Sequence, residues 1–251
     1  MHQAFVQEIF SSIQGEGPWI GERHIFVRFM GCDIHCRYCD TSVANQHDPH
    51  DAKPNCCSVQ TSSDPIRCEQ VHNPVSSSDL IKFCSRLIIP GPSRPTISLT
   101  GGEPLLQHDF LREWLPIVKG TFRIYLETNG IHAAAMENIR GLVDVVSMDF
   151  KLPSATGLRP FWEEHKHFLS AAKGKSIYIK AVVTGDTMQD DIILSARIIA
   201  EFDRTLLLVI QPAGCMLAPI STMLTTFQES ALRLIPNVRV IPQVHTILHV
   251  P

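Results

Sequence analysis

Short apolar runs of strand length alternate with segments of helical period along most of this chain. Buried strands are predicted where β-branched residues concentrate, over residues 25–29, 96–100, 122–127, 143–149, 177–183 and 206–211. Helices are predicted between and after them, over residues 80–89, 109–119, 133–140, 161–172, 188–202 and 221–234. This order indicates the α/β class, with a parallel sheet and right-handed crossovers, either open or closed into a partial barrel. Ligands of such folds bind at the carboxyl ends of the strands.

The whole chain, residues 1–251, is expected to form a single domain, since its length allows one sizeable core. Its formal net charge is −3, so the composition gives no reason to expect nucleic acid or an anionic membrane as a partner. No apolar run approaches the roughly 20 residues that a membrane helix needs, and the N-terminal residues carry no export signal. We therefore expect a soluble protein of the cytoplasm.

Three of the eight cysteines lie close together. Cys32, Cys36 and Cys39 form the pattern CxxxCxxC directly after a predicted strand, and in a reducing compartment such clustered thiols are more often metal ligands than disulfide partners. Three thiolates on one loop can bind three irons of a 4Fe–4S cluster and leave the fourth iron open. The alternative is a structural zinc ion, which would need a fourth ligand. Candidates for that ligand are His35, Cys56 and Cys68.

A second motif follows the next predicted strand, where residues 98–104 read SLTGGEP. Two consecutive glycines let the backbone approach a ligand at a place where a β-carbon would clash. Alone, the motif would indicate an ordinary turn that ends at Pro104. Together with the cysteine pattern it favours a ligand shelf beside an iron-sulfur cluster.

With these two motifs in this order, the chain resembles the radical S-adenosylmethionine superfamily over nearly its whole length. The resemblance implies a partial (β/α)6 barrel in which Cys32, Cys36 and Cys39 hold a 4Fe–4S cluster and S-adenosylmethionine binds the open iron. The cofactor then supplies a 5′-deoxyadenosyl radical, while the protein supplies position and excludes water. The cofactor-binding residues that the resemblance implies are Tyr38, Cys39, Asp40, Gly101, Gly102, Glu103, Ser147, Met148, Asp149 and Gln211.

The N-terminal segment carries a more specific resemblance. Residues 10–18 read FSSIQGEGP and residues 26–29 read FVRF, a pairing similar to the 7-carboxy-7-deazaguanine synthase family. That family converts 6-carboxy-5,6,7,8-tetrahydropterin to 7-carboxy-7-deazaguanine with loss of ammonia, in the biosynthesis of the queuosine precursor. The implied substrate-binding residues are Ile13, Gln14, Gly15, Glu16, Arg28, Thr100, Glu127, His245 and Pro251, of which Glu127 and His245 are the catalytic ones.

Two of these assignments also have a physical reason. Arg28 lies in an otherwise apolar predicted strand, where a guanidinium is costly without an anion, and the substrate carboxylate would supply one. Thr41 follows the last cysteine of the triplet, and in the resembling family this threonine binds a magnesium ion, which prefers hard oxygen ligands. The family further implies an electron donor such as flavodoxin or ferredoxin, and a homodimer.

Two segments depart from the regular pattern. Residues 42–77 have no apolar period and are expected to form an insertion or a lid loop. Cys56, Cys57 and Cys68 within it could ligate an auxiliary cluster or zinc, but adjacent cysteines suit a single metal poorly, so a variable loop is favoured. Residues 238–251 alternate apolar and polar side chains, and we expect this tail to dock in extended form with its terminal carboxylate on the substrate.

Two other functions remain open at this stage. A glycyl-radical-enzyme activase also combines CxxxCxxC with GGEP, but it would not need the pairing of Gln14 to Glu16 with Arg28. A zinc-binding module without catalysis would leave GGEP, the SMDFK run at residues 147–151 and Thr41 unexplained. The chain also departs from the resembling family at residues 245–246, which read His-Thr in place of a common histidine-lysine pair.

Overall fold

The computed structural model describes residues 3–39, 41, 56–62, 67–91, 93–214 and 217–251, with only the backbone considered for residues 217–220. These residues form a curved ten-stranded sheet and a small two-stranded sheet. From one edge to the other the large sheet consists of β12 (Val238–Val240), β11 (Leu208–Pro212), β10 (Ser176–Val183), β9 (Val145–Asp149), β8 (Arg123–Thr128), β7 (Thr96–Gly101), β3 (Arg23–Phe29), β2 (Val6–Ile13), β4 (Cys56–Gln60) and β5 (Cys68–His72). The small sheet pairs β1 (Gln3–Ala4) with β6 (Val75–Ser76).

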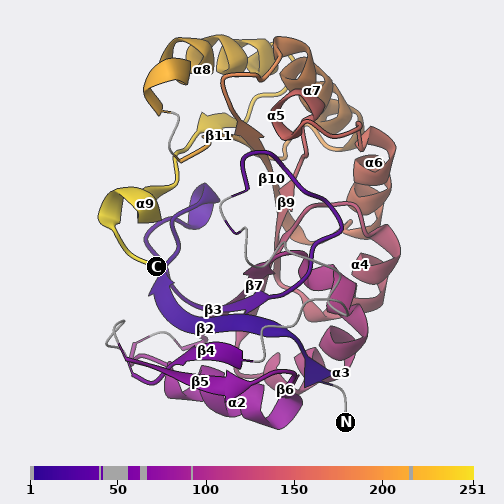
Figure 1. Ribbon diagram of the computed structural model, residues 1–251. Coiled ribbons are helices and arrows are strands. Elements are labelled where there is room, and N and C mark those ends of the chain that lie inside the picture. The colour runs from indigo at the N-terminus through magenta and orange to yellow at the C-terminus, as the bar shows by residue number, and fades with distance from the viewer. Residues whose placement is uncertain (1–2, 40, 42–55, 63–66, 92, 215–216) are drawn as a thin grey trace.

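The large sheet is parallel from β3 to β12, as the alternating sequence pattern predicts. Strand β2 runs antiparallel to β3 and parallel to β4, and β5 completes an antiparallel hairpin with β4. Strands β12 and β5 are the two edges and do not pair with each other in the described part of the chain. The sheet therefore curves into an open, partial barrel, with its concave side facing the C-terminal segment (Figure 1).

Helices cover the convex side of the sheet (Figure 1). They are α2 (Ser77–Arg86), α3 (His108–Val118), α4 (Ala133–Ile139), α5 (Pro153–Thr156), α6 (Trp162–Ala171), α7 (Gln189–Phe202) and α8 (Leu217–Leu232). Short 3-10 turns occur at η1 (Gly17–Trp19), η2 (Pro104–Gln107) and η3 (Arg140–Leu142), and α9 (Val244–Leu248) lies near the C-terminus. None of the helices within the described ranges is long and apolar enough to cross a membrane.

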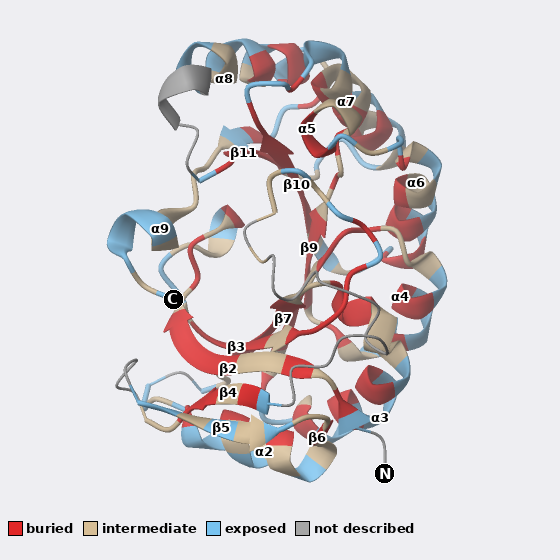
Figure 2. Cartoon of the chain, in the orientation of Figure 1, coloured by how far each residue is buried: buried red, intermediate tan, exposed pale blue. Residues whose placement is uncertain are grey.

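Helix α2 illustrates how the sequence determines these elements. The Ser76 hydroxyl accepts a hydrogen bond from the backbone N–H of Asp79 at 3.1 Å, which satisfies a free donor of the first turn. Leu80 and Cys84, one turn apart, are fully buried against the sheet. Figure 2 shows the same division in the longer helices α3, α6 and α7, whose inner faces are buried and whose outer faces are exposed. Cys84 is thus a core residue.

Several elements differ from the sequence-based expectation. Strand β2 was not predicted, and β4 and β5 lie in the segment 42–77, where we expected no regular strands. The hairpin forms because β4 buries Cys57 and Val59 against the core, while β5 exposes alternate residues and needs little apolar surface at the edge. The tail is also not extended throughout, since residues 244–248 form α9, which ends at His249 in the left-handed conformation with a φ of 53°.

Candidate active site

A cavity of about 960 Å³ occupies the concave side of the sheet, where the strands end. Its wall includes the ends of β7 to β11, the cysteine loop, the turn that follows β2 and the C-terminal tail. This is the position at which parallel α/β sheets collect their ligands, because strand ends and loops meet there.

Most residues that the sequence predicts for the site line this one cavity. They are Ile13, Gln14, Gly15, Glu16, Arg28, Cys32, Cys36, Tyr38, Cys39, Thr41, Thr100, Gly101, Gly102, Glu127, Ser147, Asp149, Gln211, His245 and Pro251. Glu103 and Met148 do not line it, and both side chains are fully buried. Asp40 lies outside the described residues.

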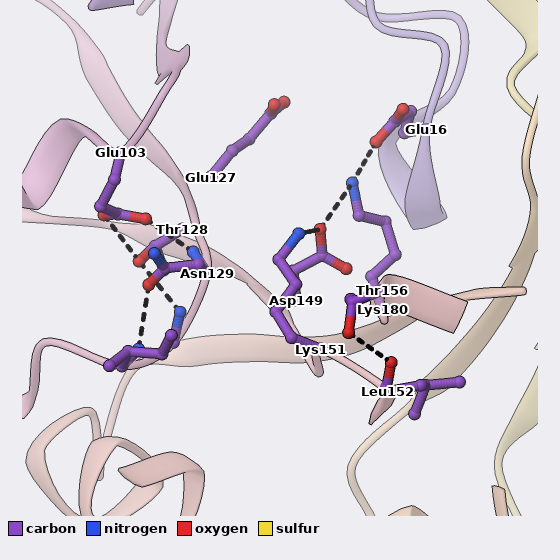
Figure 3. Close-up of polar contacts among 12 residues, drawn as sticks. Glu16, Glu103, Glu127, Thr128, Asn129, Asp149, Lys151, Leu152, Thr156 and Lys180 are labelled. Carbon is purple, nitrogen blue, oxygen red and sulfur yellow. Dashed lines mark hydrogen bonds and ion pairs between the residues drawn. The ribbon is translucent and has the colours of Figure 1, made fainter. Parts of the chain in front are cut away.

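The carboxylate of Glu103 stabilises the loops around the site. It accepts hydrogen bonds from the Leu105 N–H at 3.0 Å, the Thr128 hydroxyl at 2.9 Å and the Asn129 N–H at 2.7 Å (Figure 3). Burial raises its pKa, although its three donors and His132 oppose the shift. Glu103 therefore ties the turn after β7 to the end of β8, and the prediction of a cofactor contact for its side chain finds no support in this geometry.

The loop between Cys32 and Cys39 is anchored at both ends of its turn. The Cys39 N–H donates to the Cys36 carbonyl at 3.1 Å, and the Arg37 N–H donates to the Thr156 carbonyl at 3.1 Å. Asp33 accepts a hydrogen bond from the Asn129 side-chain amide at 3.2 Å and forms an ion pair with His132 at 3.1 Å. The loop is therefore held against the end of β8.

The three thiols of this loop share the cavity wall without converging on one point. In the described part of the chain, no three His, Cys, Asp or Glu side chains are gathered to hold a single metal ion. A cubane cluster binds each thiolate to a different iron, so it does not require the three thiols to meet at one metal ion. Burial raises the pKa of Cys32 to about 12 and also raises that of Cys36, so a thiolate at these places needs a cation such as iron.

Gly101 ends β7 in a conformation that only glycine adopts readily. Its φ is +120°, and a β-carbon there would lie 2.3 Å from the Phe29 carbonyl oxygen. The following Gly102 N–H donates to the same carbonyl at 3.0 Å. Glycine is thus required at position 101 by the close approach of β7 to β3, and both Gly101 and Gly102 line the cavity wall.

A polar cluster joins three of the predicted substrate residues. The Gln14 amide donates to Oε1 of Glu127 at 3.1 Å, and the Thr100 hydroxyl donates to Oε2 at 2.7 Å. The Gln14 side-chain carbonyl oxygen accepts the Glu16 N–H at 3.0 Å. Burial and the nearby charge of Glu16 raise the pKa of Glu127 and so favour its neutral, protonated form.

Alternating charges extend from the turn after β2 to the end of β9 (Figure 3). Lys180 Nζ lies 2.5 Å from Glu16 Oε2 and 3.8 Å from Asp149 Oδ2, and Lys151 Nζ lies 2.7 Å from the same Asp149 oxygen. Lys180 was missed by the sequence analysis, although a lysine inside the apolar run of β10 was a usable signal. The remaining oxygen of Asp149, like Oε1 of Gln211, is buried without a hydrogen-bond partner among the described residues, which points to a polar ligand.

The anion expected for Arg28 is supplied by the chain itself. Arg28 Nε donates to Glu8 Oε1 at 2.6 Å, and the guanidinium lies over the ring of Phe10 at 5.8 Å. Within the described residues the two terminal nitrogens of this guanidinium have no partner. They remain available to a carboxylate in the cavity, as a bidentate contact requires.

The C-terminal tail docks on the turn after β2. The Val244 N–H donates to the Gly15 carbonyl at 2.8 Å, and the Gln243 amide donates to Glu16 Oε1 at 2.8 Å. The His245 ring packs on Gly15 so closely that a β-carbon at Gly15 would lie 2.3 Å from its Nδ1. Gln243 was not predicted as a site residue, and no sequence motif marks it.

The cysteines of the β4–β5 hairpin do not gather at one place. Cys56 is exposed and its neighbour Cys57 is buried, because successive residues of a strand face opposite sides. Cys56 pairs with His72 at one end of the hairpin, while Cys68 pairs with Gln60 at the other. This geometry disfavours a metal shared by the three cysteines.

Comparisons with known proteins agree with this geometry. Residues 26–185 match the family model described as "Radical SAM superfamily". The chain is 37% identical over 246 residues to the 7-carboxy-7-deazaguanine synthase of Geobacter sulfurreducens, covering 96% of each. Its fold is similar to the crystal structure of QueE from Escherichia coli, with a TM-score of 0.56 at 22% identity over 96% of this chain and 94% of that one. It is also similar to Streptococcus suis SuiB bound to S-adenosylmethionine, with a TM-score of 0.51 at 16% identity over 84% of this chain and 45% of that one.

Proposed function

The chain belongs to the radical S-adenosylmethionine superfamily and within it to the 7-carboxy-7-deazaguanine synthase family, and we propose that it catalyses the reaction of that family in the cavity described above. It is a lyase that converts 6-carboxy-5,6,7,8-tetrahydropterin to 7-carboxy-7-deazaguanine with loss of ammonia. The observation that carries this conclusion is the meeting of the Gln14, Thr100 and Glu127 cluster with the cysteine loop in a single cavity.

The cofactor side of the cavity is proposed to comprise the cysteine loop, Gly101 and Gly102, and the ends of β9 and β11. Cys32, Cys36 and Cys39 would each bind one iron of the cluster. Asp149 Oδ1 and Gln211 Oε1 have no hydrogen-bond partner among the described residues, and this supports S-adenosylmethionine as their neighbour, because its hydroxyl and amino groups are donors. When bound, this cofactor pair supplies the one-electron chemistry that starts the reaction.

The substrate side is proposed to position the pterin by complementary charge and hydrogen bonding. The terminal nitrogens of Arg28, which have no partner among the described residues, are suited to the substrate carboxylate, and the Gln14 amide is suited to an edge of the ring. The raised pKa of Glu127 favours its protonated form, which could deliver a proton to the substrate or exchange one with it. His245 and Pro251 reach the cavity from the tail, where the His245 ring would accept a hydrogen bond from an amino group of the pterin ring.

We also propose a magnesium ion, with the Thr41 hydroxyl as a ligand, because Thr41 lines the cavity directly after the cysteine loop. An electron donor such as flavodoxin or ferredoxin would reduce the cluster, and the protein would act as a homodimer. The described cysteines form no disulfide with one another, which suits a reducing compartment such as the cytoplasm.

Anaerobic reconstitution tests this function. We expect about four irons per chain, and formation of 7-carboxy-7-deazaguanine from the pterin that needs S-adenosylmethionine, a reductant and magnesium. Thr41→Ala should reduce turnover of the pterin more than binding of S-adenosylmethionine, which separates the magnesium proposal from the cofactor site. A protein that carries the cluster and cleaves S-adenosylmethionine but forms no product from this pterin would refute the substrate assignment.

A further inference from the structure

Lys180, in the middle of β10, reaches two carboxylates from different sides of the cavity. It is only 8% exposed. Burial disfavours its charged form, but Asp149 and Glu16 outweigh burial and raise its pKa well above the ordinary value. The amine is therefore a permanent positive charge between the substrate side and the cofactor side of the site.

Glu16, one of its partners, has both carboxylate oxygens occupied. Oε2 receives Lys180, and Oε1 accepts the amide of Gln243 from the tail. Burial alone would raise the pKa of Glu16, but Lys180 and then Gln243 reverse the shift and lower the pKa to about 2. Without Lys180, an ionised carboxylate would remain buried with no compensating charge, which strongly disfavours the native arrangement.

The turn that contains Glu16 is also the turn on which the tail docks. Gly15 accepts the Val244 N–H and packs against His245, and Glu16 accepts the Gln243 amide. The rest of α9 packs loosely, since Ile247 is 55% exposed and Leu248 is 49% exposed. Gly214 also lies close to Gln243, since a β-carbon there would be 2.8 Å from Gln243 Oε1. The position of residues 243–251 therefore depends in part on how firmly Gly15 and Glu16 are held.

Lys180 also contacts the cofactor side through Asp149. Asp149 Oδ2 is shared by Lys180 and Lys151, while Oδ1 has no partner in the described part of the chain (Figure 3). A ligand that engages Oδ1 acts on the same carboxylate that helps to hold Lys180. Binding at one end of this charged series and docking at the other are thus connected by direct contacts.

We propose that Lys180 is a positioning residue for the C-terminal segment 243–251, which it fixes through Glu16, and that it couples occupation of the cofactor side to closure of this segment over the cavity. The coupling to S-adenosylmethionine rests on the proposed function, whereas the control of the tail does not. By reciprocity, whatever strengthens the contacts of Asp149 also favours docking of the tail, and docking of the tail favours the ligand.

Hydrogen exchange of the peptide that spans residues 241–251 tests the proposal directly, since it needs no turnover. In the anaerobically reconstituted protein, Lys180→Met should speed exchange of this peptide about tenfold. S-adenosylmethionine should slow that exchange in the unmodified protein and leave it unchanged in Lys180→Met. Iron content should stay the same, while KM for the pterin should rise about tenfold with a smaller change in kcat.

Two further variants keep the test decisive. Glu16→Gln combined with Lys180→Met removes the unpaired charge and should return exchange of the tail toward the original rate, because the amide oxygen of the substituted side chain still accepts the Gln243 amide. Gln243→Ala removes the contact from the tail side, so it serves if Lys180→Met does not fold. Lys82→Met is the matched control, because Lys82 forms an ion pair with Asp79 on the surface with its side chain 71% exposed.

Unchanged exchange of the tail in both Lys180→Met and Gln243→Ala would overturn the proposal. Failure of the proposed function has a different signature, since the pterin would then not be consumed although exchange of the tail still depended on Lys180. Slower exchange caused by S-adenosylmethionine in Lys180→Met, equal to that in the unmodified protein, would refute the coupling while leaving the reaction intact.

Discussion

Glu16 and Glu127 both contact Gln14, and their pKa values are shifted in opposite directions in the same cavity. Gln14 donates to Glu127 and accepts the N–H of Glu16. Lys180 and Gln243 lower the pKa of Glu16 to about 2 against the effect of burial, whereas burial and the charge of Glu16 raise the pKa of Glu127. Neighbouring carboxyl groups whose environments separate their pKa values are typical of acid and base chemistry.

The first prediction follows from the raised pKa of Glu127. Glu127→Gln keeps the size and the hydrogen-bond acceptor but removes the transferable proton, so kcat should fall about a hundredfold. Iron loading and binding of S-adenosylmethionine should persist, as spectroscopy and equilibrium binding would show.

The pH profile tests the same residue. Because the protonated form is the active one, kcat should fall as pH rises through the raised pKa of Glu127, and this decline should be missing from the residual activity of Glu127→Gln. The free energy of unfolding should also fall as pH rises through this range, because a group whose pKa is raised in the folded state stabilises the fold only while it is protonated. A kcat that increases over this range would contradict the assignment.

The second prediction compares cysteines of different location. Cys36→Ala should abolish iron loading, because its thiolate holds one iron of the cluster. Cys84→Ala is the matched control, since Cys84 is fully buried in the core and its loss should cost about 1 kcal/mol of stability without changing iron content. Iron analysis after anaerobic reconstitution, together with urea unfolding, checks both. A full cluster in Cys36→Ala would refute the ligand set.

The third prediction concerns Glu8, which orients the guanidinium of Arg28. Glu8→Gln weakens the hydrogen bond that orients Arg28 Nε, so KM for the pterin should rise about fivefold with little change in kcat. Arg28→Lys should be more severe, because an ammonium cannot satisfy Glu8 and a carboxylate with the same planar geometry. A pterin analogue without the carboxylate, tested as a competitive inhibitor, should bind the Glu8→Gln variant as well as it binds the original protein.

The fourth prediction uses the tight contact between Gly15 and the tail. A methyl group in Gly15→Ala would lie 2.3 Å from His245 Nδ1 and 2.6 Å from the His245 backbone nitrogen, so the tail has to move. KM should rise about tenfold while iron content is unchanged. Gly185→Ala is the control, because nothing lies within 4 Å of a β-carbon there. Equal kinetics for the two variants would show that the docked tail does not contribute to substrate binding.

The strands and helices of the barrel were predictable because each buried run has a clear period and clear ends. Ser76 at the start of α2 and Cys84 on its inner face follow directly from local sequence. The positions of the cysteine triplet and of the glycine pair at strand ends were predictable for the same reason. These features depend on neighbours in sequence.

The parts that sequence did not reveal depend on distant partners. Glu103 belongs to a conspicuous motif, yet its carboxylate contacts the end of β8 instead of the cavity. Arg28 finds its anion in Glu8, on the antiparallel neighbour β2. Lys180 belongs to the site because it pairs with Glu16, which lies far away in sequence. The hairpin β4–β5 forms by pairing with β2, a strand that was itself not predicted.

The hairpin β4–β5 has a consequence for how the molecule behaves in a crowded solution. It covers the side of β2 that would otherwise be the edge of the sheet, and β2 carries apolar side chains such as Ile9 and Phe10. The new edge, β5, is short and exposes Cys68, Gln70 and His72, which offer little to an approaching strand of another molecule. Shortening this hairpin would therefore uncover an aggregation-prone edge, even though no residue of β5 lines the cavity.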